Sequence, residues 1–125
     1  MAVKRFIDED HAEILGWHAA HKQAGPSFDD LPTYGLIEHG VAAGFLILTD
    51  ARVGILEYYI SNPNVAPMVR SKALDDITVG LIDYGKKFGL KYFKCDTQLV
   101  TIGQRAMKHG LEFQGKFSAY FMKGS

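Results

Sequence analysis

The sequence has a single cysteine, Cys95, among its 125 residues. One thiol excludes an internal disulfide, so a hydrophobic core must hold the chain together. No apolar run approaches the roughly 20 residues of a membrane-spanning helix, and the start, MAVKRFIDEDH, turns acidic too soon for a signal peptide. Neither charge sign is in excess, because 14 lysines and arginines balance 14 aspartates and glutamates. These absences favour a cytoplasmic protein that binds neither a membrane nor nucleic acid.

The histidines do not fall into a metal-binding pattern. His11, His18 and His21 share one predicted helix, but zinc needs three or four converging ligands. No cysteine pair or acidic residue stands at a useful spacing from them. A solvated helix face is the favoured interpretation, and no metal site is expected.

The chain has the length of one domain, and we assign residues 1–125 to it. Hydrophobic periodicity and turn residues predict nine elements. These are strands at 1–7, 34–38, 41–48, 54–60, 91–97 and 111–123, and helices at 8–22, 67–88 and 101–109. Asp8 is the expected N-cap of the first helix. The order β-α-β-β-β-α-β-α-β predicts an α/β domain with a mixed, mostly antiparallel sheet flanked by helices.

The helix predicted over residues 67–88 has the clearest pattern. Pro67 suits its first turn and Gly89 its C-terminal cap. Its apolar stripe has three- and four-residue spacing and comprises Val69, Ala73, Leu74, Ile77, Leu81, Gly85 and Phe88. A strand and the turn SNPNVAP precede it, and a helix N-terminus that follows a strand commonly binds phosphate.

The stretch LPTYGLIEHGVAAGFLILTDARVGILEYYISNPNVAP resembles small proteins of the GNAT N-acetyltransferase superfamily that bacteriophages and prophages encode. Those proteins commonly read LP-x-x-G, a Gly-rich hairpin, and then a strand such as LEW followed by NP. The later AMKHGLEF is similar to the Y-x-K-x-GF end of the last GNAT helix, so the resemblance covers roughly residues 12–122. It implies the GNAT fold and an acyl-CoA-dependent N-acyltransferase whose acceptor is an amine, on a small molecule or a protein lysine.

The resemblance also implies where the cofactor, acetyl-CoA or another acyl-CoA, is bound. The pantetheine would run along the strand before the long helix, and the pyrophosphate would lie at the entry to that helix. The family pattern there is Arg/Gln-x-x-Gly-x-Gly/Ala. Arg70 takes the first place and Ala73 the first small place, but Asp75 stands at the second. The implied cofactor-binding residues are Ile60, Ser61, Asn62, Val69, Arg70, Ser71, Lys72 and Ala73.

The catalytic candidates are Glu57 and Tyr59. Glu57 lies mid-strand between apolar neighbours, where a buried carboxylate would act as a general base. The alternative is that it faces solvent or pairs with a cation on a neighbouring strand. Tyr59 would serve as a substitute acid or as a packed aromatic, since one of Tyr58 and Tyr59 faces the core and the other the cleft.

Three positions depart from the family pattern. Ala106 replaces the tyrosine that in many relatives protonates the leaving thiolate, Leu99 replaces an asparagine, and Asp75 replaces a small residue. These departures favour an alternative function, in which a GNAT-fold phage protein has lost catalysis and binds a host or virion protein. The sequence leaves open whether the chain is a monomer or a homodimer.

Overall fold

The computed structural model describes residues 2–95. Its elements are β1 (Val3–Arg5), the 3-10 turn η1 (Asp8–Asp10), α1 (His11–Ala20), the 3-10 turn η2 (Phe28–Asp30), β2 (Tyr34–Glu38), β3 (Ala42–Leu48), β4 (Val53–Ser61), α2 (Pro67–Lys87) and β5 (Tyr92–Lys94). This order confirms the predicted β-α-β-β-β-α-β part of the domain. The helix predicted at 101–109 and the strand predicted at 111–123, with Leu99 and Ala106, lie outside the described residues.

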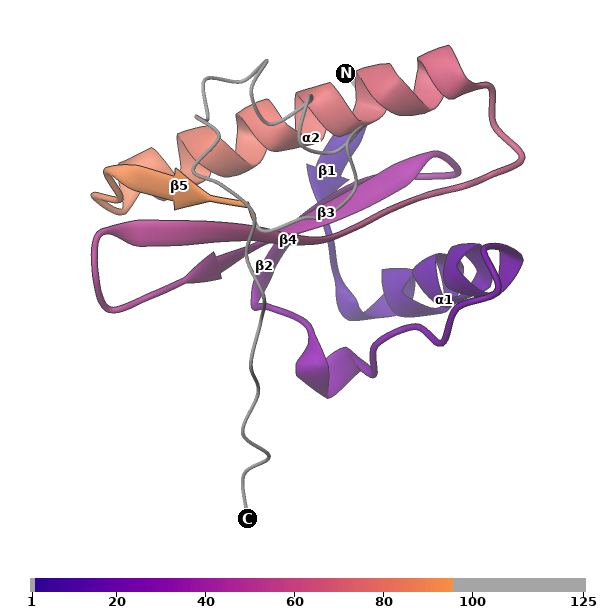
Figure 1. Cartoon of the computed structure of the whole chain (residues 1–125), viewed down its shortest axis with the longest axis horizontal. Coiled ribbons are helices and arrows are strands. Elements are labelled where there is room, and N and C mark those ends of the chain that lie inside the picture. The colour runs from indigo at the N-terminus through magenta and orange to yellow at the C-terminus, as the bar shows by residue number, and fades with distance from the viewer. Residues whose placement is uncertain (1, 96–125) are drawn as a thin grey trace.

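The strands form one mixed sheet in the order β1-β2-β3-β4-β5. The first four strands are antiparallel neighbours, and β5 runs parallel to β4. Helix α1 covers one face of the sheet and α2 the other, so the fold has three layers (Figure 1). The prediction of a mixed, mostly antiparallel sheet flanked by helices is therefore confirmed.

Alternation along the strands divides the core between the two faces of the sheet. Leu46 on β3 pairs with Leu56 on β4, and both pack beneath α2. The neighbouring Phe45 points the other way and packs with Ile14 and Trp17 of α1. Because successive side chains of a strand point to opposite faces, one apolar run such as AAGFLIL supplies both cores.

Helix α2 has the ends that the sequence predicts. Pro67 is its first residue, and Gly89 adopts a φ of +81° just after its last turn. The Gly89 N–H donates to the Lys86 carbonyl and the Leu90 N–H to the Gly85 carbonyl. This pair of bonds is a Schellman cap, which satisfies the last carbonyls of the helix.

The start of the first helix differs from the prediction. Residues Asp8–Asp10 form a 3-10 turn before α1, and its N-cap position is Ile7 instead of Asp8. The Asp10 carboxylate reaches back and accepts a hydrogen bond from the Ile7 N–H at 2.9 Å. The capping carboxylate is thus that of Asp10, inside the turn. Sequence spacing alone does not show whether Asp8 or Asp10 caps the helix.

Candidate functional site

A β-bulge interrupts β4 next to the predicted catalytic residues. Ala43 pairs with Ile60 and Phe45 pairs with Glu57, so one residue of β3 stands opposite two residues of β4, Tyr58 and Tyr59. Tyr58 has a φ of +58°. An L-residue in this left-handed region costs about 1–2 kcal/mol. Bulges of this kind redirect side chains and are common beside active sites.

The bulge sends Tyr59 toward α2. Its hydroxyl lies 2.7 Å from the Thr78 Oγ1, and the Thr78 hydroxyl donates to the Leu74 carbonyl at 2.8 Å. Since the single proton of Thr78 is used there, Tyr59 is the donor in their contact. The ring lies over Gly44, where an added Cβ would be 2.4 Å from Tyr59 Cε1. This geometry matches the packed-aromatic alternative for Tyr59.

Glu57 and Tyr58 lie on the opposite face, toward α1. Glu57 is paired with Phe45, whose side chain is buried in the α1-side core, and is itself half-buried. Tyr58 packs its ring edge-on against Phe45 at 6.5 Å and remains 36% exposed. A carboxylate and a partly exposed phenol therefore share one face of the bulge.

The edge of β4 that faces β5 is paired only at its beginning. Val53, Gly54 and Ile55 pair with Tyr92–Lys94. Within residues 2–95, no strand pairs with this edge from Leu56 to Ser61. Such an edge presents backbone N–H and C=O groups that an extended ligand with amide groups can bind.

The loop after β4 leads directly into the N-terminus of α2. Ala66 is the N-cap residue and provides no side-chain cap. Its carbonyl accepts the N–H groups of Val69 and Arg70 at 3.0 and 3.1 Å. Of the predicted phosphate-binding residues, Val69, Arg70, Ser71, Lys72 and Ala73 thus lie inside the helix, so their backbone N–H groups serve helical bonds. Anion binding at this end therefore depends on the helix dipole and on side chains.

Arg70 is the cation best placed for that role. Its Nε is buried and has no hydrogen-bond partner among residues 2–95. No ion pair of Arg70 occurs within the described part of the chain. Lys72, in contrast, is exposed and pairs with Asp76 at 3.1 Å, while Ala73 is buried under the sheet-facing side of the helix. A guanidinium in the second turn of a helix, with its Nε unpartnered among residues 2–95, suits an anionic ligand.

The other predicted cofactor-binding residues are Ile60, Ser61 and Asn62, and each has a side chain or a backbone group that stabilises the fold. Ile60 is buried in the α1-side core. The Ser61 carbonyl accepts a hydrogen bond from His21 Nε2 at 2.9 Å. Asn62 uses Nδ2 to donate to the Gly40 carbonyl and Oδ1 to accept from the Asn64 N–H. The Asn62 N–H and carbonyl are also engaged, with the Val41 carbonyl and the Val65 N–H, so the backbone left for a ligand is that of β4, on the edge that is unpaired within residues 2–95.

No protein-family model and no curated protein sequence matches this chain, but solved structures match its fold. An acetyltransferase from Trypanosoma brucei has a TM-score of 0.70 at 10% identity, over 96% of this chain and 98% of that one. Aminoglycoside 6'-N-acetyltransferase AAC(6')-IG from Acinetobacter haemolyticus has a TM-score of 0.62 at 16% identity, over 100% and 99%. Aminoglycoside N-acetyltransferase AAC(6')-Iy, in complex with CoA, has a TM-score of 0.66 at 13% identity, over 98% and 99%.

The chain has the fold of the GNAT acetyltransferases. Each of the three matches covers nearly all of both chains. The resemblance to phage proteins in particular stays a prediction. No helix of the described residues is long and apolar enough to cross a membrane.

One histidine of this GNAT-fold chain departs from the predicted solvated helix face. His18 is buried on the inner side of α1, and neither ring nitrogen has a partner in the part of the chain that the structure describes. His11 and His21 each use Nε2 to donate to a backbone carbonyl, of Pro26 and Ser61 respectively. Among the described residues, no group of three side chains is arranged to hold a metal ion.

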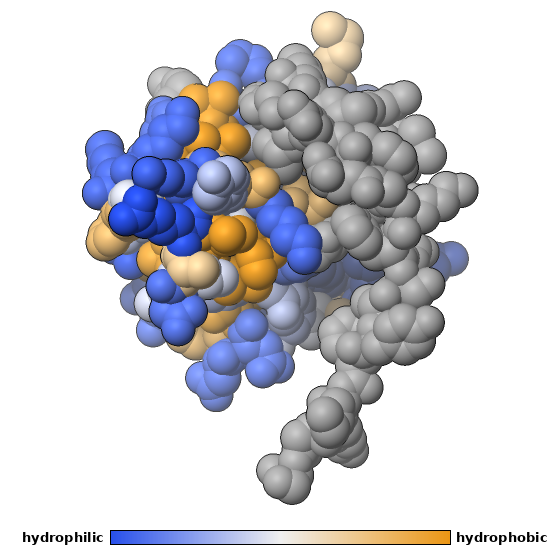
Figure 2. All heavy atoms as spheres, turned by 60° about the vertical axis from the view of Figure 1, so that its left-hand side comes forward, coloured by the Kyte–Doolittle hydropathy of each residue, from blue (hydrophilic) through white to orange (hydrophobic). Residues whose placement is uncertain are grey.

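A surface hollow of about 640 Å³ lies at the other end of β4, away from the bulge. It is lined by the β3–β4 turn (48–52) and by the segment after α2 (88–91). Figure 2 shows this end of the molecule, where apolar side chains lie among hydrophilic ones. The Arg52 carbonyl accepts the N–H groups of Lys91 and Tyr92, and the Thr49 hydroxyl donates to the Val53 carbonyl at 2.7 Å. None of the described residues that line it is a buried polar side chain without a partner, so we assign it no ligand.

Proposed function

We propose that the chain is an acyl-CoA-dependent N-acyltransferase that uses acetyl-CoA and an amine acceptor. The observation that carries this proposal is the bulge at Tyr58, which adjoins an edge of β4 that is unpaired within residues 2–95 and leads into the N-terminus of α2. The named acetyltransferases that share the fold support it, and one of them is described in complex with CoA.

The residues present fit such a cofactor. Backbone groups from Leu56 to Ser61 are suited to the two amides of a pantetheine arm. The Arg70 guanidinium, whose Nε is buried without a partner, is suited to the pyrophosphate beside the positive end of α2. Ser71 and Lys72 follow in the same turns and add polar and positive character. The small side chain of Ala73 lets the helix lie close to the sheet.

Acetyl-CoA would supply an acetyl thioester: its C–S bond would break as the C–N bond to the amine forms, and CoA would leave as a thiolate that takes a proton from water. Glu57 takes the proton that the amine loses, directly or through one water, because its half-buried carboxylate lies beside the bulge. Backbone N–H groups of β4 at the bulge would stabilise negative charge on the reacting carbonyl oxygen. The amine attacks without a covalent enzyme intermediate.

The role of Tyr59 as an acid is tested by Tyr59→Phe. Its hydroxyl already donates to Thr78, and water can protonate a thiolate leaving group. We therefore expect Tyr59→Phe to lower kcat less than the roughly 10²–10⁴-fold that loss of a general acid typically costs. A loss within that range would establish Tyr59 as the acid.

Calorimetric titration of acetyl-CoA tests the proposal, with CoA and desulfo-CoA alongside. We expect micromolar affinity, weakened at least about tenfold by Arg70→Ala because one charge-assisted contact is lost. Arg52→Ala, which removes an arginine from the hollow at the opposite end of β4, is the matched control and should bind normally. No binding at millimolar cofactor would reject the acyltransferase.

A second candidate function is a GNAT-fold protein that has lost catalysis and binds a host or virion protein. The observation that favours it is Asp75, a carboxylate in the third turn of α2 where the family pattern has a small residue. An amine panel with thiol release as the readout separates the two. Acetyl-CoA binding without thiol release for any amine, including polyamines and lysine peptides, would favour the binding protein.

A further inference from the structure

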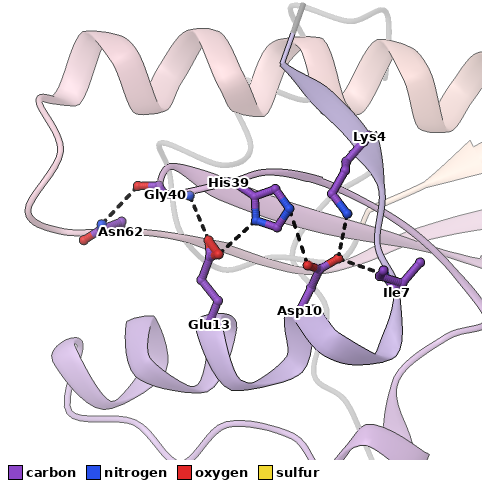
Figure 3. A network of polar contacts seen from close by, with 7 residues as sticks. All are labelled: Lys4, Ile7, Asp10, Glu13, His39, Gly40 and Asn62. Atoms are coloured by element: carbon purple, nitrogen blue, oxygen red, sulfur yellow. Dashed lines mark hydrogen bonds and ion pairs between the residues drawn. The ribbon is translucent and has the colours of Figure 1, made fainter.

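Three segments that are far apart in the sequence meet at the turn between β2 and β3 (Figure 3). Glu13 of α1 accepts a hydrogen bond from the Gly40 N–H through Oε2 at 2.7 Å, and its Oε1 lies 3.0 Å from His39 Nδ1. The Gly40 carbonyl accepts a hydrogen bond from Asn62 Nδ2 at 3.0 Å. Gly40 therefore connects α1 to the first residue after β4.

Asn62 in turn sets the path of the loop that follows. Its Oδ1 accepts from the Asn64 N–H at 3.0 Å, and its carbonyl accepts from the Val65 N–H at 3.2 Å. Its own N–H donates to the Val41 carbonyl at 2.8 Å. The loop has only five residues, Asn62 to Ala66, before α2 begins. A rotation of Asn62 would therefore alter the approach to the helix N-terminus.

The surroundings of the turn favour a fixed position for Glu13. His39 also lies 3.5 Å from the Asp10 carboxylate, which pairs with Lys4 at 3.4 Å. Gly40 has a φ of +78°, which glycine adopts without strain. Both carboxylate oxygens of Glu13 are engaged, so its side chain is held at two points.

We infer that Glu13 is a positioning residue for the loop between β4 and α2, acting through Gly40 and Asn62. The inference deepens the proposed function, on which it rests for the cofactor that this loop receives. A substitution of Glu13 should therefore alter the structure of residues 62–66, although Glu13 does not contact them directly.

Amide hydrogen exchange of the ligand-free protein tests the inference directly. In Glu13→Leu, the Asn64 and Val65 amides should exchange about tenfold faster, because the support of Asn62 through Gly40 is lost. Glu13→Gln should exchange nearly as the parent protein does, since its amide oxygen still accepts from the Gly40 N–H. Ser27→Ala, which removes an exposed hydrogen bond to Asp30, is the control and should leave both amides unchanged.

Unchanged exchange at Asn64 and Val65 in Glu13→Leu, or a change confined to Gly40, would overturn the inference. A second experiment measures the affinity of each variant for acetyl-CoA, well below the melting temperature of that variant. Glu13→Leu should weaken binding about five- to tenfold, and Glu13→Gln should restore it; equal affinities would overturn the link to the cofactor. Failure of the parent protein to bind would reject the proposed function, and the exchange rates would still decide the role of Glu13.

Discussion

The packing of Tyr59 against Gly44 makes a quantitative prediction for Gly44→Ala. The new Cβ would be 2.4 Å from Tyr59 Cε1, and ordinary contact begins at 3.4 Å, so the ring must move by 3.4 − 2.4 = 1.0 Å. A shift of that size takes the hydroxyl from 2.7 Å to as much as 3.7 Å from Thr78 Oγ1, which breaks the hydrogen bond. Ile77 Cγ2 would be 3.1 Å from the same Cβ, so the new methyl group cannot avoid the ring by moving toward α2.

The expected cost combines overpacking and the lost bond. Overpacking a core costs about 1–3 kcal/mol, and the hydrogen bond contributes about 1 kcal/mol. We therefore expect Gly44→Ala to lower the free energy of unfolding by about 2–4 kcal/mol, measured by urea denaturation. In a Tyr59→Ala background the same substitution should cost less than about 1 kcal/mol, because the ring is absent.

A matched control is Gly16→Ala. Gly16 lies in α1, and an added Cβ there meets nothing within 4 Å. Alanine should be neutral or stabilise the helix by up to about 1 kcal/mol. Equal costs of Gly44→Ala with and without the Tyr59 ring would refute the reasoning.

Two further predictions concern buried polar groups. His18→Leu should raise the free energy of unfolding by about 1–2 kcal/mol in urea denaturation, because two unpartnered ring nitrogens leave the core; an equal or lower stability would contradict the assignment of His18 to the interior. Burial, and then the neighbouring Tyr84, raise the pKa of Tyr34 while Arg5 opposes the shift. A raised pKa in the folded state means that stability is complete below the unfolded value of 10.0 and is lost as the pH rises beyond it. Tyr34→Phe should therefore lose less stability than the parent protein between pH 9 and pH 11 in denaturation experiments, and parallel alkaline losses would be inconsistent with the shift.

Local sequence patterns predicted the elements well. The strand predicted at 34–38 is β2, and the helix predicted at 67–88 ends one residue earlier, at Lys87. Both have strong periodicity and clear turn residues at their ends, namely Gly40 and Gly89, each with positive φ in the structure. Where the hydrophobic periodicity and the turn residues indicate the same bounds, an element can be predicted with little knowledge of its tertiary contacts.

The candidate site was harder to predict, for physical reasons. A bulge that uses the left-handed region is usually marked by glycine, and here the residue is Tyr58. The sequence therefore predicted that Tyr58 and Tyr59 face opposite sides without indicating which one faces α2. Ile14, Trp17 and His18 share one face of the helix, and this spacing was a signal that His18 is buried. We considered the histidines only as metal ligands or as solvated residues.

Long-range contacts were beyond local patterns altogether. Nothing near Glu13 in the sequence indicates that it binds the Gly40 amide, 27 positions away. The family resemblance implied that Asn62 binds the cofactor, yet its side chain joins that same turn. The sheet register brings these segments together, and register depends on the whole fold.

The measurement that tests the central claim most directly is an amide chemical-shift map of the labelled protein titrated with acetyl-CoA. The account predicts the largest shifts from Leu56 to Ser61 and from Met68 to Arg70, along the unpaired edge of β4 and the first turns of α2. The hollow formed by residues 48–52 and 88–91 should be unaffected. Shifts concentrated at that hollow, or none anywhere in the chain, would contradict the account.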